Sequence, residues 1–155
     1  MAIIESRVTI NAPIDFVYRT SQDYSVRYDW DPFPENISVV SGDSNELAVG
    51  TQVEVKSKLG MDMLVEFVQI MPPTRAAVKM IKGPWVLEKF AGSWIFQEGL
   101  SDAQTEARFR YTIIAKPKPF RLLIEPLAAL YFSRVVSKRL AGLKAYCEKH
   151  VRARA

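Results

Sequence analysis

Residues 120–149 read FRLLIEPLAALYFSRVVSKRLAGLKAYCEK, and this stretch decides the fold. Apolar residues recur in it every three or four positions, which is the spacing of one face of an α-helix. They form two adjoining stripes, one made of Ile124, Leu127, Tyr131 and Val135, and the other of Phe132, Val136, Leu140, Leu143 and Cys147. The combined face suits a helix laid across a β-sheet, which we expect to be kinked or divided by Pro126.

The residues before this helix predict a sheet. From Ile3 to Ile10 apolar and polar side chains alternate, which is typical of a half-buried strand. Asn11 and Pro13 then predict a helix start, with Asn11 as the cap, and we expect short helices at about residues 13–20 and 23–30. Between residues 36 and 116, alternating segments are separated by Pro, Gly and polar turns, which predicts about six antiparallel strands.

This order of elements predicts an α+β fold, in which a curved antiparallel sheet wraps around the C-terminal helix at about residues 120–149. A chain of 155 residues has the length of one domain, and we see no internal repeat and no linker. We therefore expect residues 1–155 to form a single domain.

The rarer residues exclude several kinds of site. With one Cys and one His, the chain can form neither an intramolecular disulfide nor a Cys/His zinc cage. His150 lies close to the C-terminus among basic residues, a poor place for a catalytic base. We expect no bound metal and no cofactor. The lone Cys147, and the charges at Glu5 and Arg7 where a signal peptide needs an apolar run, predict a cytoplasmic protein.

The net charge of +4 conceals an uneven distribution. Residues 108–155 carry 12 Lys and Arg against Glu125 and Glu148, whereas residues 1–107 carry 9 basic against 15 acidic residues. The basic C-terminal part is either a solvated helix face or a surface for weak association with an anionic membrane or an acidic partner. No motif for nucleic-acid binding accompanies the charge, so we expect no nucleic-acid partner. Nothing in the sequence indicates an oligomeric state.

The inward sides of the predicted strands contain no Asp, Glu, Lys, Arg or His. Such a surface either fills a core or lines a pocket for an apolar ligand, with Tyr and Trp supplying a polar handle. The predicted pocket residues are Trp30, Val55, Met63, Val65, Phe67, Val78, Met80, Phe90, Trp94, Phe96, Phe109, Tyr111, Leu127, Tyr131 and Val135.

Candidates for catalysis are few. Asp29 and Asp31 flank Trp30, and two nearby carboxylates can act as acid and base or hold a divalent cation. Residues two apart on a helix point away from each other, however, and Asp before Pro commonly forms a turn. Tyr111 is the interior group with a usable proton, although a buried Tyr is more often a core hydroxyl with a satisfied hydrogen bond.

Three segments together resemble the START-like superfamily, in its polyketide cyclase/dehydrase-type branch. They are Asn11-Ala12-Pro13-Ile14-Asp15-Phe16-Val17-Tyr18 after the first strand, Tyr28-Asp29-Trp30-Asp31-Pro32-Phe33, and Leu140-Ala141-Gly142-Leu143-Lys144 near the end. The resemblance implies a helix-grip fold, with seven antiparallel strands around a long C-terminal helix and an apolar pocket between them. It also implies binding of lipids, polyketides or isoprenoids, which some members cyclise or dehydrate. Aromatase/cyclase members use pocket Arg, Tyr or Trp side chains; Trp94 and Tyr111 are available here, but the sequence shows no inward Arg.

The leading hypothesis is therefore a carrier or sensor of a hydrophobic small molecule. The first alternative is an enzyme of cyclase/dehydratase type, with Tyr111 as proton donor and Asp29 or Asp31 as base. It requires that a carboxylate or an Arg reach the pocket. The second alternative is association with an anionic membrane or a partner through the basic C-terminal region.

Overall fold

The computed structural model describes residues 2–23, 26–31, 34–41, 48–57, 62–115 and 121–154. In chain order its elements are β1 (Ala2–Ile10), α1 (Ile14–Gln22), α2 (Arg27–Trp30), β2 (Pro34–Ser41), β3 (Gln52–Ser57), β4 (Asp62–Met71), β5 (Arg75–Lys82), β6 (Leu87–Glu98), β7 (Thr105–Ala115) and α3 (Arg121–Arg154). The predicted order is confirmed. The expected limits of strands and helix at residues 116 and 120 fall outside the described residues.

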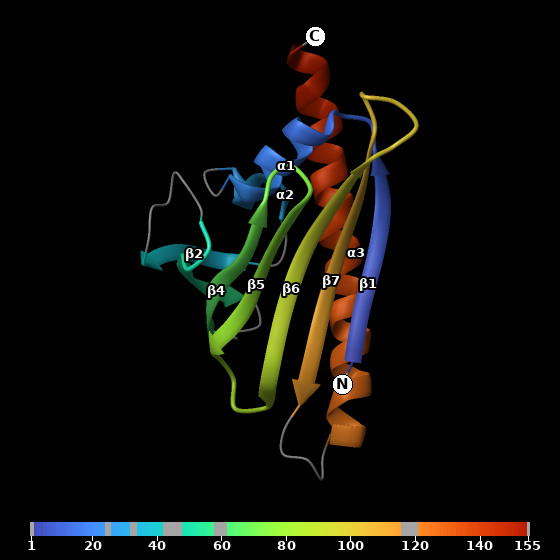
Figure 1. The fold of residues 1–155 in the computed structure, drawn as a ribbon. Helices are drawn as coiled ribbons and strands as arrows, with labels where there is room; N and C mark the ends of the chain where they lie inside the picture. Colours follow the sequence, from blue (N-terminus) through green and yellow to red (C-terminus); the bar gives the residue numbers. More distant parts are fainter. Residues whose placement is uncertain are drawn as a thin grey trace.

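The strands form one antiparallel sheet of seven strands in the order β1-β7-β6-β5-β4-β3-β2. The first strand therefore pairs with the last, and the others follow one another as a meander. The sheet curves around α3, which lies along its concave side behind β6, β7 and β1 (Figure 1). The curvature has a local cause in β4, which carries one residue more than β5 between Phe67 and Gln69, since such a bulge bends a strand. The predicted helix-grip fold is confirmed.

The long helix buries one of its two predicted stripes more fully than the other. Phe132, Val136, Leu140, Leu143 and Cys147 are all buried. In the other stripe, Ile124, Tyr131 and Val135 are half-buried, whereas Leu127 is 69% exposed. The prediction that Leu127 faces the interior is thus wrong, because the sheet covers one side of the helix and leaves its first turns open on the other. The helix continues through Pro126 without being divided.

Two details of the short helices differ from the sequence expectation. The N-cap of α1 is Pro13, while the Asn11 side chain accepts a hydrogen bond from Gln104 Nε2 at 3.2 Å. The second helix has four residues and begins at Arg27 rather than at residue 23, and residues 24–25 of the expected helix fall outside the described residues. In the part of the chain that the structure describes, no helix has the length and apolar character needed to cross a membrane.

Candidate functional site: a cavity between the sheet and the long helix

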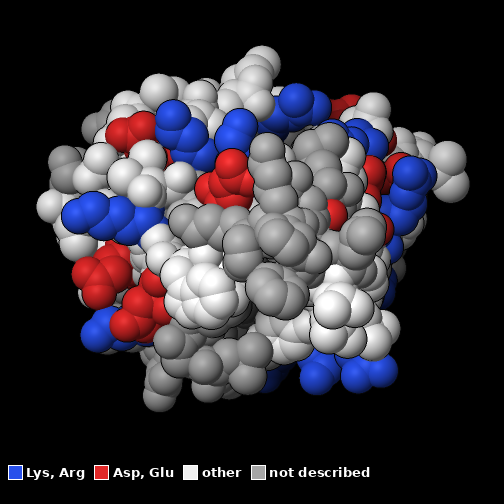
Figure 2. All heavy atoms as spheres, turned by 90° about the horizontal axis from the view of Figure 1, so that it is seen from below, with Lys and Arg blue, Asp and Glu red and all other residues white. Residues whose placement is uncertain are grey.

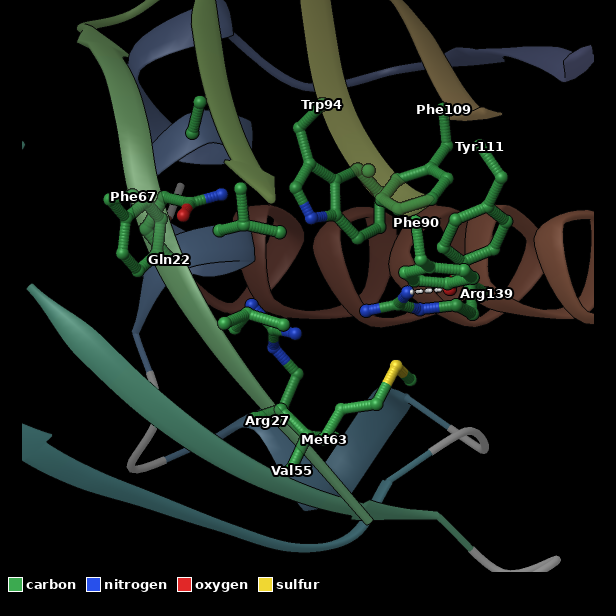
Figure 3. A pocket seen from close by; sticks show the side chains of 14 residues that line it. Gln22, Arg27, Val55, Met63, Phe67, Phe90, Trp94, Phe109, Tyr111 and Arg139 are labelled. Atoms are coloured by element: carbon green, nitrogen blue, oxygen red, sulfur yellow. Dashed lines mark hydrogen bonds between the residues drawn. The ribbon is translucent and has the colours of Figure 1, made fainter. Parts of the chain in front are cut away.

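A cavity lies between the concave face of the sheet and the helices (Figure 3). The strands supply its apolar wall, which consists of Val55, Met63, Val65, Phe67, Ala76, Val78, Phe90, Gly92, Trp94 and Phe109. Its volume is about 650 Å³ when the open mouth is counted, and the centre of a water molecule can reach about 80 Å³ of that space. Gly92 lies in this wall beside the aromatic side chains. A Cβ at this position would stand 3.2 Å from the Phe109 ring, so the absence of a side chain leaves room for that ring.

Four polar side chains complete the wall. They are Gln22 at the end of α1, Arg27 at the start of α2, Tyr111 on β7 and Arg139 on α3. All four can donate a hydrogen bond, and none of the described lining residues carries a carboxylate. Figure 3 shows Gln22 and Arg27 across the cavity from Phe109 and Tyr111. Apart from Tyr111 on β7, the cavity is therefore apolar along the sheet, and its other donors come from the helices.

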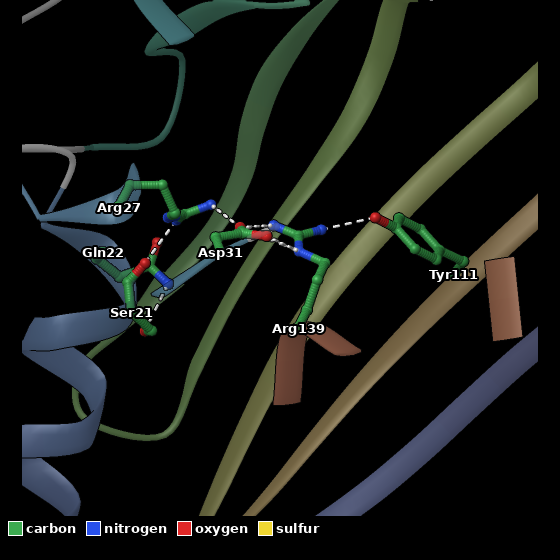
Figure 4. Close-up of polar contacts among 6 residues, drawn as sticks. All are labelled: Ser21, Gln22, Arg27, Asp31, Tyr111 and Arg139. Atoms are coloured by element: carbon green, nitrogen blue, oxygen red, sulfur yellow. Dashed lines mark hydrogen bonds and ion pairs between the residues drawn. The ribbon is translucent and has the colours of Figure 1, made fainter. Parts of the chain in front are cut away.

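Asp31 holds the two arginines in place from behind the cavity wall (Figure 4). Arg139 Nε donates to both carboxylate oxygens at 3.1 Å, and Arg139 Nη2 donates to Oδ2 at 2.8 Å. Arg27 Nη1 donates to the same Oδ2 at 3.3 Å, and its Nη2 donates to the carbonyl oxygen of Ser21. The Asp31 side chain is fully buried, so these bonds join α1, α2 and α3 in an environment where charge pairing is strong.

Arg139 is also enclosed by aromatic side chains. Its Nη1 donates to the Tyr111 hydroxyl at 2.6 Å, and its guanidinium carbon lies 4.7 Å from the Phe109 ring centre and 5.2 Å from that of Trp94. The rings pack against one another, with centroids 4.4 Å apart for Trp94 and Phe109 and 4.7 Å apart for Phe109 and Tyr111. A planar cation on these ring faces gains cation–π attraction as well as hydrogen bonds, which favours one fixed orientation of the guanidinium.

Burial and charge act in opposite directions on the ionisation of Arg139 and Tyr111. Burial alone would lower the pKa of Arg139, but the Asp31 carboxylate and the Tyr111 hydroxyl raise that pKa above its ordinary value. Burial raises the pKa of Tyr111 above its ordinary value of 10.0, although the charge of Arg139 opposes the shift. At neutral pH the cavity thus contains a cationic guanidinium beside a protonated phenol.

The structure brings most of the sequence-predicted pocket residues to the cavity wall. They are Val55, Met63, Val65, Phe67, Val78, Phe90, Trp94, Phe109 and Tyr111. The remaining predicted residues lie elsewhere: Trp30 is buried with its ring centre 5.7 Å from that of Trp94, Phe96 is in the core, Met80, Tyr131 and Val135 are half-buried beside it, and Leu127 faces solvent.

The expectation of an interior without ionisable groups, and without an inward Arg, is wrong. Arg27, Asp31 and Arg139 are buried, because each is paired with an opposite charge. The strands alone suggested an uncharged interior, whereas these side chains come from α2, its C-cap and α3. A signal for Arg139 existed in the sequence: it follows Val136 by three residues and precedes Leu143 by four, so it shares their helix face.

Asp29 and Asp31 do not act as a pair. Asp31 is buried between the arginines, while Asp29 is exposed. Within the described residues, no group of three or more His, Cys, Asp or Glu could hold a metal ion. Figure 2 shows the end of the molecule away from the C-terminus, with Lys and Arg around its edge and Asp and Glu among them. Association of the basic C-terminal region with an anionic membrane stays a prediction.

The chain matches the family model described as "Polyketide cyclase / dehydrase and lipid transport" over residues 1–148. None of the curated proteins matches it significantly in sequence. Among solved structures, it resembles a START superfamily protein from Mycobacterium smegmatis with a TM-score of 0.78, 9% identity, and coverage of 95% of this chain and 97% of the other.

Two aromatase/cyclases share the fold. For the Zhui aromatase/cyclase from a Streptomyces species the TM-score is 0.78 and the identity 18%, with 99% of this chain and 98% of the other covered. For the di-domain aromatase/cyclase BexL of the BE-7585A biosynthetic pathway the values are 0.72 and 20%, with 94% and 46% covered. Identities this low show a common fold. Because the family model spans nearly the whole chain, the protein belongs to the polyketide cyclase/dehydrase and lipid transport family.

Proposed function

We propose that the protein binds a hydrophobic small molecule of lipid, polyketide or isoprenoid type in the cavity, as a carrier or sensor. The observation that carries the proposal is the continuous apolar wall supplied by β3 to β7. Burying apolar ligand surface is worth about 25 cal/mol per Å², so a ligand burying ~200 Å² would gain about 5 kcal/mol before the costs of association. Family membership supports the same class of ligand.

The size of the cavity bears on how such a ligand enters. A dry cavity of about 150 Å³ is enough for benzene, whereas the water-accessible space here is about 80 Å³. A ligand with more than one ring must therefore displace side chains. Met63 lines the cavity on a long, unbranched and apolar side chain, which makes it the wall group that can move at least cost, whereas Arg27 is held by Asp31. We expect binding to be accompanied by rearrangement at this side of the cavity.

Binding of the neutral dye N-phenyl-1-naphthylamine tests the proposal. Val78 points into the cavity, and Val78→Phe fills it, so this variant should weaken dye binding by about tenfold or more. Ile81→Phe is the matched control, because Ile81 lies on the same strand with its side chain 41% exposed, and we expect it to leave dye binding unchanged. Native mass spectrometry of the purified protein would reveal a co-purified ligand. Absence of dye binding to the unmodified protein would refute the proposal.

The first alternative, an enzyme of cyclase/dehydratase type, is favoured by one observation. Tyr111 and Arg139 meet at the cavity wall, where a phenol and a guanidinium can polarise the carbonyl oxygen of a polyketide chain. The proposed bases fit this role poorly, since Asp31 accepts hydrogen bonds from two guanidinium groups and Asp29 is exposed. Incubation with a linear poly-β-ketone should then yield a cyclised product that has lost water, detectable by mass spectrometry and abolished by Tyr111→Phe.

A further inference from the structure

The cavity contains two cations that are held close together. Oδ2 of Asp31 accepts a hydrogen bond from Arg27 at 3.3 Å and from Arg139 at 2.8 Å, so both guanidinium groups lie within hydrogen-bond distance of one oxygen atom. Two like charges this close repel each other, and the carboxylate between them offsets that repulsion. Figure 4 shows the resulting row of side chains, from Arg27 through Asp31 and Arg139 to Tyr111.

The carboxylate that joins the arginines does not reach the cavity. Asp31 is not among the lining residues, and its side chain is fully buried behind the wall, whereas Arg27 and Arg139 both line the cavity. Among the charged residues that are buried in the described part of the chain, two are cationic and one is anionic. A ligand in the cavity therefore faces donors and positive charge at its polar end, and apolar side chains elsewhere.

We propose that the ligand carries an anionic oxygen group, a carboxylate or an enolate, which binds to Arg27 and Arg139 while its apolar body lies along the wall of Val65, Phe67 and Val78. This inference rests on the proposed function, because it names the class of ligand for the same cavity. A guanidinium group matches two oxygens of a planar anion, and charge-assisted hydrogen bonds gain strength where water is excluded. Asp31 is a positioning residue in this site, since it contacts the arginines rather than the ligand.

Three probes of nearly equal shape separate charge from apolar contact: 2-naphthoate, 2-naphthamide and 2-naphthylmethylammonium. A charge-assisted hydrogen bond contributes enough to favour the carboxylate over the neutral amide by about tenfold or more in Kd. The ammonium probe should bind least, because it places a third cation beside two arginines. Isothermal titration calorimetry measures the three affinities. Equal affinities for carboxylate and amide would overturn the inference and leave the proposed function standing.

Arg27→Met tests where the anion binds. This variant removes one cation and leaves Asp31 paired with Arg139, so one buried cation then faces one buried anion and we expect the fold to persist. The ratio of carboxylate to amide affinity should fall toward one, and Arg27→Lys should restore part of it. Arg19→Met is the matched control, since Arg19 is exposed on α1, and it should leave the ratio unchanged. A ratio that survives Arg27→Met would place the anion elsewhere and refute the two-arginine site. If the unmodified protein bound none of the three probes and not the neutral dye either, that result would instead count against the proposed function itself.

Discussion

Arg139 Nη1 donates a hydrogen bond of 2.6 Å to the hydroxyl of Tyr111, joining the long helix to the last strand across the cavity. The other side of the same guanidinium group binds Asp31, the C-cap of α2. One side chain thus connects α3, β7 and α2 at the point where all three approach the ligand space. The stability of the fold and the shape of the cavity therefore depend on the same contacts, which makes both accessible to mutation.

Asp31→Asn should be strongly destabilising. The change leaves two buried guanidinium groups without the carboxylate between them, and removing one partner of a buried ion pair costs about 3–5 kcal/mol. Chemical denaturation measures this loss in the free energy of unfolding. Asp29→Asn, two residues away and exposed, is the control and should change stability by no more than about 0.5 kcal/mol. Similar effects of both variants would show that Asp31 does not anchor the arginines.

Tyr111→Phe should cost about 1–3 kcal/mol in the free energy of unfolding. The ring keeps its contacts with Phe90 and Phe109, so the loss arises because the buried Arg139 Nη1 no longer has the phenolic oxygen as acceptor. Urea denaturation measures the change. The additional variant Arg139→Met separates this bond from packing: in the double variant the effects should be less than additive, since one interaction is removed twice. Strict additivity would contradict the coupling.

Stability should fall as the pH rises above 9. Burial raises the pKa of the Cys147 thiol from 9.0 to about 12, and burial also raises the pKa of Tyr111 above 10.0. The folded protein then retains protons that the unfolded chain releases, so the free energy of unfolding decreases with increasing pH between about 9 and 12. Denaturation midpoints at several alkaline pH values measure the slope. Cys147→Ala should make it shallower, and an unchanged slope would assign the loss to other groups.

Leu127 and Phe132 should respond very differently to substitution, although both belong to the apolar pattern of the long helix. Leu127 is 69% exposed, so Leu127→Gln should alter the free energy of unfolding by less than about 0.5 kcal/mol. Phe132 is buried against Phe90 and Tyr111, so Phe132→Ala should cost about 3–5 kcal/mol. Thermal unfolding followed by circular dichroism distinguishes them. A large loss for Leu127→Gln would mean that this face is covered in solution.

Much of the cavity wall could be predicted from the strands, because alternation assigns each side chain to one of two faces. Met63, Val65 and Phe67 on β4 show this, since their spacing of two residues places all of them on the concave side. Periodicity alone does not decide which helix residues reach the cavity. Tyr131 and Leu127 continue the apolar periodicity, but the width of sheet that covers a helix is not encoded in the helix itself.

By itself the sequence determined the class of fold and the apolar wall, because hydrophobic periodicity is a local property of strands and helices. The polar end of the cavity was decided by the tertiary structure. Asp31 and Arg139 lie 108 residues apart in the chain and pair only when α3 crosses the concave face of the sheet. A charge is buried when its partner is also buried beside it, and which partners meet depends on long-range packing rather than on neighbouring residues. For that reason a cavity that was expected to be uncharged contains two arginines.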